Sequence, residues 1–162
     1  MANQLSITDF QTLIGYSDVK SFPVYFYVQK DRRFDKINTP VPFDIETSNV
    51  GNAMNLQSGV FTAPRNGIYF FSISGIAHVT SKAHGVFHLK LILNGKYIGN
   101  GAADTVGVAY ETVSIQSLLV LKVGDRVWLE LPGGQVNAYL HDNSNHFTHF
   151  TGWMLQEDFS QS

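Results

Sequence analysis

The 162-residue chain contains no cysteine, and only 15% of its residues are charged. It therefore has no disulfide and no thiol nucleophile, and a chain of this length buries enough apolar surface to fold without such cross-links. Its 11 Lys and Arg residues are matched by 13 Asp and Glu residues, so no basic field exists to hold a phosphate backbone. The longest uninterrupted apolar runs are four or five residues, far below the roughly 18 that suggest a membrane span. We therefore expect neither nucleic-acid binding nor membrane insertion.

Signatures of catalysis and of histidine metal sites are also missing. No Gly-X-Ser-X-Gly nucleophile elbow occurs, so an activated nucleophile with its base and orienting acid would have to come from scattered loops. His84 and His88 are four residues apart, which on a strand puts them on one face about 13 Å from each other, too far to share a metal ion. His146 and His149 would face opposite sides of a strand. We expect a protein that is not an enzyme.

Short apolar alternations, separated by Gly, Pro and Asn, fill the chain from Ser21 onward. This period of two residues predicts β-strands that bury one face. Asn94-Gly95 is a strong hairpin signal, because a type I′ turn needs positive φ at both of its central positions. In Pro64-Arg65-Asn66-Gly67, proline presets φ and we expect Gly67 to supply a positive φ. The predicted strand regions are 24–28, 68–79, 87–93, 96 onward, 113–121, 127–131 and 147–155.

These strands and turns predict an all-β fold, a two-sheet jelly-roll sandwich of about ten strands. We divide the chain into an N-terminal arm or linker (1–21), a globular domain (22–159) and a C-terminal tail (160–162). Only the arm has helix-like apolar spacing, between Ile7 and Ile14, and an ordinary terminal arm explains it equally well.

Three segments, 24–28, 118–121 and 147–155, are apolar or aromatic on both faces. Because a two-layer sandwich buries only one face of each sheet, the second face needs another cover. An exposed apolar patch usually marks an interface, and cyclic symmetry is a common way to cover one. The alternative is that loops or the N-terminal arm of the same chain cover these residues.

Four blocks in chain order resemble the globular-head domain of the C1q and tumour necrosis factor superfamily. They are NVGNAMNLQSGVFTAPRNGIYFF (49–71), LILNG (91–95), SLLVLKVGDRVWLEL (117–131) and HFTGWML (149–155). Met54 stands where the family usually has an aromatic residue. The resemblance covers about residues 22–157, and four ordered blocks are more specific than one short motif. The matching residues are turn formers and core aromatics, so the signature describes a fold and not a chemistry.

The resemblance implies a secreted, C1q-like homotrimer that binds ligands on its outer and apical loops. We expect a lectin-like recognition module for carbohydrate or protein ligands, as in innate immunity, in which three weak sites gain avidity on densely displayed ligands. The alternatives are a cytokine-like or synaptic-organiser-like signalling ligand for a cell-surface receptor, and a structural matrix component. Residues 1–22 show no collagen-like repeat and no coiled-coil pattern.

The ligand is expected on the segment 132–146, which we interpret as a loop with an aromatic platform and short polar groups. Such a composition is also typical of an ordinary solvated loop. The basic segment 31–42 is the second candidate, for anionic ligands such as sialylated glycans. The candidate ligand-binding residues are Tyr139, His141, Asp142, Asn143, Asn145 and His146, with Arg32 and Arg33 in the second segment.

No cofactor is required by this interpretation, but the resemblance implies a possible Ca²⁺ site near the apex of the trimer. Asp104 and Glu111 flank the corresponding loop, and carboxylates are the ligands that such hard cations prefer. Solvated surface charge is the alternative for both residues.

Overall fold

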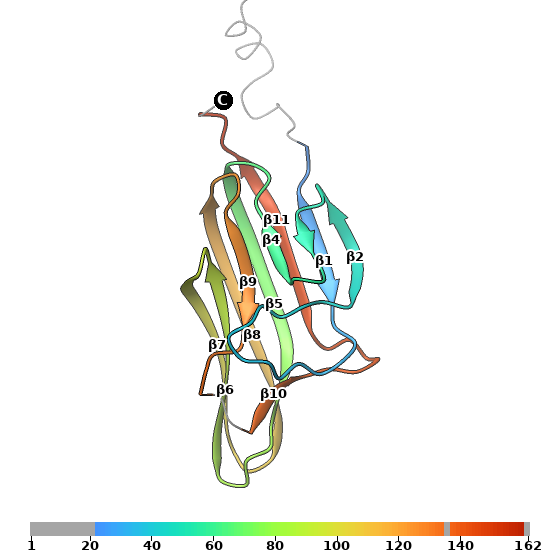
Figure 1. Cartoon of the computed structure of the whole chain (residues 1–162), viewed down its shortest axis with the longest axis vertical. Coiled ribbons are helices and arrows are strands. Elements are labelled where there is room, and N and C mark those ends of the chain that lie inside the picture. Colours follow the sequence, from blue (N-terminus) through green and yellow to red (C-terminus); the bar gives the residue numbers. More distant parts are fainter. Residues whose placement is uncertain (1–21, 135–136, 161–162) are drawn as a thin grey trace, which may run out of the picture.

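Two antiparallel sheets face each other in the computed structural model, which describes residues 22–134 and 137–160 (Figure 1). The predicted all-β jelly-roll class is confirmed, and the described residues contain no helix. The helix-like spacing at 7–14, and the rest of the expected N-terminal arm, lie outside the described residues. The strands are β1 (Tyr25–Gln29), β2 (Ile45–Val50), β3 (Met54–Asn55), β4 (Val60–Thr62), β5 (Gly67–Val79), β6 (His84–Leu93), β7 (Lys96–Val106), β8 (Ala109–Leu121), β9 (Arg126–Glu130), β10 (Ala138–His141) and β11 (His149–Glu157).

The six-stranded sheet is built around β5. On one side β5 pairs with β8 along its whole length, so β8 forms that edge of the sheet. On its other side β5 pairs first with β11 and then, over its last four residues, with β10. Strand β1 pairs with β11 on one side and with β2 on the other, so the strand order is β10-β5-β11-β1-β2. The five-stranded sheet has the order β3-β4-β9-β6-β7.

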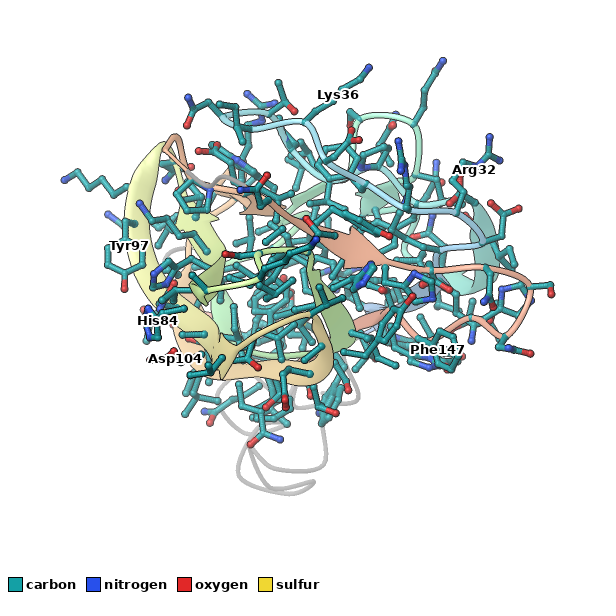
Figure 2. All side chains as sticks on the ribbon, turned by 90° about the horizontal axis from the view of Figure 1, so that it is seen from below. Arg32, Lys36, His84, Tyr97, Asp104 and Phe147 are labelled. Carbon is teal, nitrogen blue, oxygen red and sulfur yellow. The ribbon has the colours of Figure 1, made fainter. Side chains whose placement is uncertain are left out.

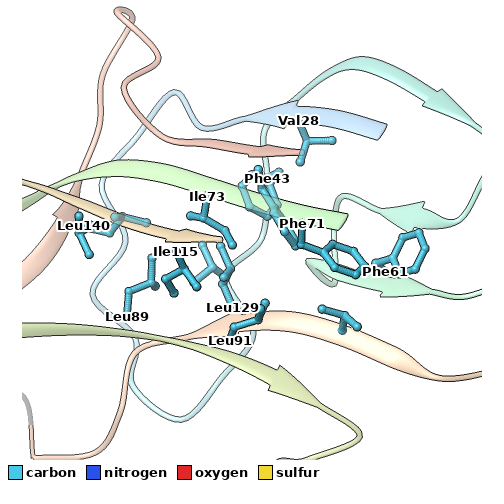
Figure 3. Close-up of a cluster of buried hydrophobic side chains, with 14 of the residues drawn as sticks. Val28, Phe43, Phe61, Phe71, Ile73, Leu89, Leu91, Ile115, Leu129 and Leu140 are labelled. Carbon is cyan, nitrogen blue, oxygen red and sulfur yellow. The ribbon is translucent and has the colours of Figure 1, made fainter. Parts of the chain in front are cut away.

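The core lies between the two sheets and is rich in aromatic rings (Figure 3). Phe26, Phe61, Phe71 and Phe150 are at most 1% exposed, and Phe150 meets Phe26 edge to face with ring centroids 4.9 Å apart. Burying each such ring contributes about 1.5–3 kcal/mol relative to leaving it exposed. The predicted alternation is confirmed along β5, where every second side chain is buried. The core is therefore one cluster to which both sheets contribute side chains.

The turns confirm one glycine prediction and correct another. Asn94 and Gly95 have φ of 51° and 80°, as a type I′ hairpin requires. Gly67 does not take the expected positive φ. It is instead needed for close packing, because a Cβ at this position would lie 2.3 Å from the carbonyl oxygen of Gln156 on β11. The constraint comes from a strand 89 residues further along the chain, which local turn chemistry does not report.

The segment 132–146 is not the single loop that its composition suggests. It contains β10, whose four residues pair with β5 from Val79 to Ile76. The strand forms because the Leu140 side chain is fully buried. The backbone N–H and C=O groups of Leu140 also form hydrogen bonds with the backbone C=O and N–H groups of Phe34. The last strand also begins at His149 and not at Phe147. Tyr139 and His141 therefore project from a sheet and not from a solvated loop.

Both ends of the described chain lie at the same pole of the sandwich (Figure 1). Gly67 at the start of β5 lies opposite Leu121 at the end of β8 and Glu157 at the end of β11. At the other pole Val79, the last residue of β5, lies opposite Ala109 and Ala138. Each sheet face therefore runs from the pole that holds the chain ends to the opposite pole, where β5 ends.

Candidate functional site

The outward face of the six-stranded sheet carries no Asp, Glu, Lys or Arg among the residues that strand register places on it. We call it the neutral face. Its members are Tyr25, Tyr27, Gln29, Ile45, Ser48, Val50, Ile68, Phe70, Ser72, Ser74, Ile76, His78, Tyr110, Thr112, Ser114, Gln116, Leu118, Val120, Tyr139, His141, His149, Thr151, Trp153 and Gln156.

The outward face of the five-stranded sheet is a direct comparison within the same molecule. Its strands alternate in the same way, but their outward positions include Lys90, Asp104, Arg126 and Glu130. Charged side chains are the usual cover of a sheet face that meets water. Their absence from the neutral face, over six strands, is what distinguishes the two sides of the sandwich.

The pole that holds the chain ends bears the apolar part of the neutral face. Leu118 and Val120 on β8 are 61% and 78% exposed, and across the sheet Trp153 packs on Phe70 with ring centroids 4.6 Å apart. Next to Trp153, Tyr25 helps to line an open pocket of about 380 Å³. These outward apolar groups were predicted from the double-faced segments, and no described part of the chain covers them.

The opposite pole of the neutral face bears a cluster of histidine and tyrosine. His78 stacks on Tyr110 with ring centroids 4.0 Å apart, and its Nδ1 lies 2.6 Å from the hydroxyl of Tyr139. His141 meets the edge of Tyr110 and stacks on Phe147, which precedes β11. We call these five residues the histidine cluster. Burial lowers the pKa of His78 below its usual value, and the nearby His141 lowers it further.

A second histidine–tyrosine pair lies in the middle of the neutral face. The hydroxyl of Tyr27 on β1 lies 2.5 Å from Nδ1 of His149 on β11, and the two rings stack. The amide of Gln29 is 3.2 Å from the same imidazole nitrogen. Around this pair the face is polar, with Ser72, Thr151 and their neighbours on β8.

Asp142, a predicted ligand-binding residue, is only 5% exposed and already has its partners. Its carboxylate accepts hydrogen bonds from the backbone N–H groups of Asn143, Phe147 and Thr148 at 2.7–3.0 Å. It thus shapes the turn between β10 and β11 and does not face solvent. This placement corrects the expectation that Asp142 is available to a ligand.

The turn between β10 and β11 lies against the basic segment that sequence analysis treated as a separate candidate. The Lys30 N–H donates to the carbonyl of Thr148, and Nδ1 of His146 lies 3.0 Å from the carbonyl of Lys30. Phe34 and Leu140 are also paired, as an isolated antiparallel β-bridge between the two segments. The described parts of the two predicted ligand segments therefore adjoin, and we call the surface formed by residues 31–42 and 137–146 the loop surface.

The remaining predicted ligand residues differ in their exposure to solvent and in the hydrogen bonds or ion pairs that they already form. On the loop surface Asn143 and Asn145 are exposed, although the Asn143 side chain accepts a hydrogen bond from the Asn145 N–H. Arg32 projects outward (Figure 2) and bonds to Asp31 and Asp44. The guanidinium of Arg33 lies 5.3 Å from the ring centroid of Tyr139, which joins the loop surface to the histidine cluster.

The two predicted calcium ligands are not brought into one coordination set. Asp104 on β7 pairs with His84 of β6 at 2.5 Å (Figure 2), whereas Glu111 lies on β8 in the other sheet, opposite Ala77. In the part of the chain that the structure describes, no group of three or more His, Asp and Glu residues could hold a metal ion. These residues do not fit a calcium site within one chain.

Sequence analysis missed His78, Tyr110, Tyr27 and His149 as functional candidates. Their signal was present, since each lies at an outward position of an alternating strand, but their neighbours depend on the register of strands that are distant in sequence. The charge-free face was likewise hidden until outward positions from six strands were assembled.

Comparison with known proteins identifies the family. The C1q domain matches residues 25–155, and the chain therefore belongs to the C1q-domain family. It is 28% identical over 134 residues to human complement C1q tumor necrosis factor-related protein 3, a match that covers 83% of this chain and 52% of that protein. It is 30% identical over 123 residues to zebrafish Caprin-2, covering 75% of this chain and 13% of Caprin-2. The chain thus spans about half, or much less, of these relatives.

Solved structures show the same fold. The globular domain of zebrafish complement 1qA protein superposes with a TM-score of 0.64 at 20% identity, covering 83% of this chain and 99% of that one. Murine APRIL superposes with a TM-score of 0.58 at 15% identity, over 82% and 99% of the two chains. The predicted C1q/TNF-like architecture is confirmed. In the described residues no helix is long and apolar enough to cross a membrane.

Proposed function

We propose that the protein is a secreted, non-enzymatic recognition module that acts as a homotrimer, with the neutral face as the contact between subunits. The observation that carries the proposal is the absence of charge over this face, in contrast to the charged outward face of the other sheet. Interface cores are depleted of charged residues and enriched in aromatic ones, which is the composition of the apolar pole.

The arrangement of the apolar groups supports a ring and not a two-fold dimer. Leu118 and Val120 project at the β8 edge, whereas the pocket beside Tyr25 and Trp153 lies across the sheet toward β2. A projection at one side and a hollow at the other suit a head-to-tail contact, and such contacts form a cyclic assembly when the rotation between subunits closes. Three subunits also agree with the family to which the chain belongs.

In this arrangement ligand recognition belongs to the loop surface. Tyr139 and His141 lie on the neutral face, while Asn143, Asn145, Arg32 and part of His146 stay outside it. The exposed amide groups of Asn143 and Asn145 can donate and accept hydrogen bonds, which suits hydroxyl-rich ligands, and we propose glycans as the ligand class. Three copies on one rigid trimer would bind densely displayed glycans by avidity.

The assembly is tested by sedimentation equilibrium at neutral pH, where the subunit of 18.0 kDa should give a species of three times that mass. A stable monomer at micromolar concentration would remove the assembly and its avidity together.

Ligand binding is tested on a glycan array with the trimer, the Asn145→Ala variant and, as a matched control on the other sheet, Asn100→Ala. We expect glycan binding that only Asn145→Ala weakens. Saturable binding to a single cell-surface protein without glycan binding would favour a signalling ligand instead. The Ca²⁺ expectation is tested by measuring the mass with and without chelator.

A further inference from the structure

We propose that the neutral face is a pH-sensitive interface, in which protonation of His78, His141 and His149 releases the subunits from one another. This inference rests on the proposed trimer and names its regulation. Histidine is the side-chain type that ordinarily changes charge between pH 5 and 8, and His78, His141 and His149 are the histidines that strand register places on this face.

The surroundings of His78 favour its neutral form. It packs between Tyr110 from β8 and Tyr139 from β10, with His141 at a centroid distance of 6.2 Å. The Nδ1 of a neutral imidazole can accept the hydrogen bond of the Tyr139 hydroxyl, whereas both ring nitrogens of an imidazolium donate, so the hydroxyl would have to turn and accept. If His78 and His141 are both protonated, two like charges lie within one cluster of rings. The burial that already lowers the pKa of His78 in the single chain would deepen when a second subunit covers the face.

His149 is held in the same way at the centre of the face. Its Nδ1 faces the Tyr27 hydroxyl from β1 and the Gln29 amide, and Ser74 of β5 lies opposite it. None of these groups carries a negative charge near neutral pH. A proton on His149 would therefore be desolvated at the interface without a compensating partner.

The charged groups near the histidine cluster do not offset the positive charge of a protonated imidazole. Glu111 follows Tyr110 on β8, and strand alternation turns it to the opposite side of the sheet from His78. The Asp142 carboxylate beside His141 is buried and used by three backbone N–H groups. Arg33, over the Tyr139 ring, adds positive charge to the histidine cluster and opposes further protonation.

The direction of the pH effect follows from the thermodynamic linkage between proton binding and subunit assembly. A histidine whose pKa is lower in the assembly than in the free subunit stabilises the assembly fully above its free pKa, and this stabilisation is lost as the pH falls through that value. If assembly lowers one histidine pKa by about one unit, three symmetry-related copies raise the trimer dissociation constant roughly 500-fold between pH 8 and pH 5. The protein concentration at half-assembly then rises about 20-fold, as the square root of that constant.

The experiment is sedimentation equilibrium of the full chain at pH 8.0, 6.5 and 5.0, with near-UV circular dichroism to report folding. The test variants are His78→Gln, His141→Gln and His149→Gln, singly and combined, because glutamine keeps a polar side chain that does not titrate. His84→Gln is the matched control, since His84 pairs with Asp104 outside the neutral face. We expect folded subunits to separate at pH 5.0 in the wild type and the control, and the combined variant to stay assembled.

The outcomes separate the two proposals. A wild type that is monomeric at pH 8.0 overturns the trimer, and the pH inference with it. A wild type that is trimeric at both pH extremes, or that separates only as it unfolds, overturns the pH inference alone. If the combined variant does not assemble at pH 8.0, the single variants decide: each should reduce the pH-dependent shift of the half-assembly concentration, and an unchanged shift in all three overturns the inference.

Discussion

Truncating Val120 to alanine should weaken the assembly without weakening the subunit. Val120 is 78% exposed on the neutral face, and Val106, at the end of β7, is 83% exposed outside it. The same substitution at both sites removes two methyl groups and changes strand propensity similarly, so Val106→Ala is a matched control. In the proposed trimer, only Val120→Ala removes apolar area that a neighbouring subunit covers.

The magnitude follows from the exposed area. Each buried methylene-sized group contributes about 0.8 kcal/mol, and scaling the two lost groups by the exposed fraction gives about 1.2 kcal/mol per subunit. Three subunits lose about 4 kcal/mol, which raises the trimer dissociation constant roughly 1,000-fold and the half-assembly concentration about 30-fold. Sedimentation equilibrium over a dilution series measures this shift. Equal effects of the two variants, or none from Val120→Ala, would refute the assignment of the neutral face as the interface.

Three further predictions concern the single subunit. Gly152→Ala should lower the free energy of unfolding by about 1–3 kcal/mol in urea titrations, because its Cβ would lie 2.6 Å from Phe26 and 2.8 Å from Phe71. An unchanged urea midpoint would show that both rings shift without cost. Asp142→Ala should cost about 2–4 kcal/mol by the same measurement, since one buried and two part-buried N–H groups lose a charged acceptor, and a loss of ligand binding without this cost would contradict its structural role. The lowered pKa of His78 means that the unfolded chain binds its proton more readily, so stability should fall as the pH drops below about 6.5. Thermal unfolding of His78→Gln at pH 5 and 8, run well below the assembly concentration, should show a smaller difference than the wild type.

The parts of the fold that depend on local pattern were predictable from the sequence. The alternation from Ile68 to Val79 fixes which side chains of β5 are buried, and Asn94-Gly95 fixes a hairpin through its two positive φ values. The double-faced segment 118–121 correctly indicated exposed apolar groups. In each case the determining residues lie within a few positions of one another.

The errors arose where distant segments decide the outcome. The role of Gly67 depends on Gln156, and β10 forms because Leu140 fits the core, although its flanking residues have a turn-like composition. Asp142 has the composition of a solvated loop residue, but the turn that it organises folds back over its carboxylate. The histidine cluster required the register of three strands, which no single stretch of sequence contains.

The shared pole of the two chain ends has a practical consequence for handling the protein. A tag or fusion partner attached before β1 or after β11 would emerge next to Tyr25 and Trp153, beside the apolar part of the neutral face (Figure 1). In the proposed trimer, a bulky attachment there would obstruct neighbouring copies, whereas the turns that precede β6 and follow β7 lie at the opposite pole. Reporters and surface-coupling groups are therefore better placed at those distal turns, which leave the crowded pole free.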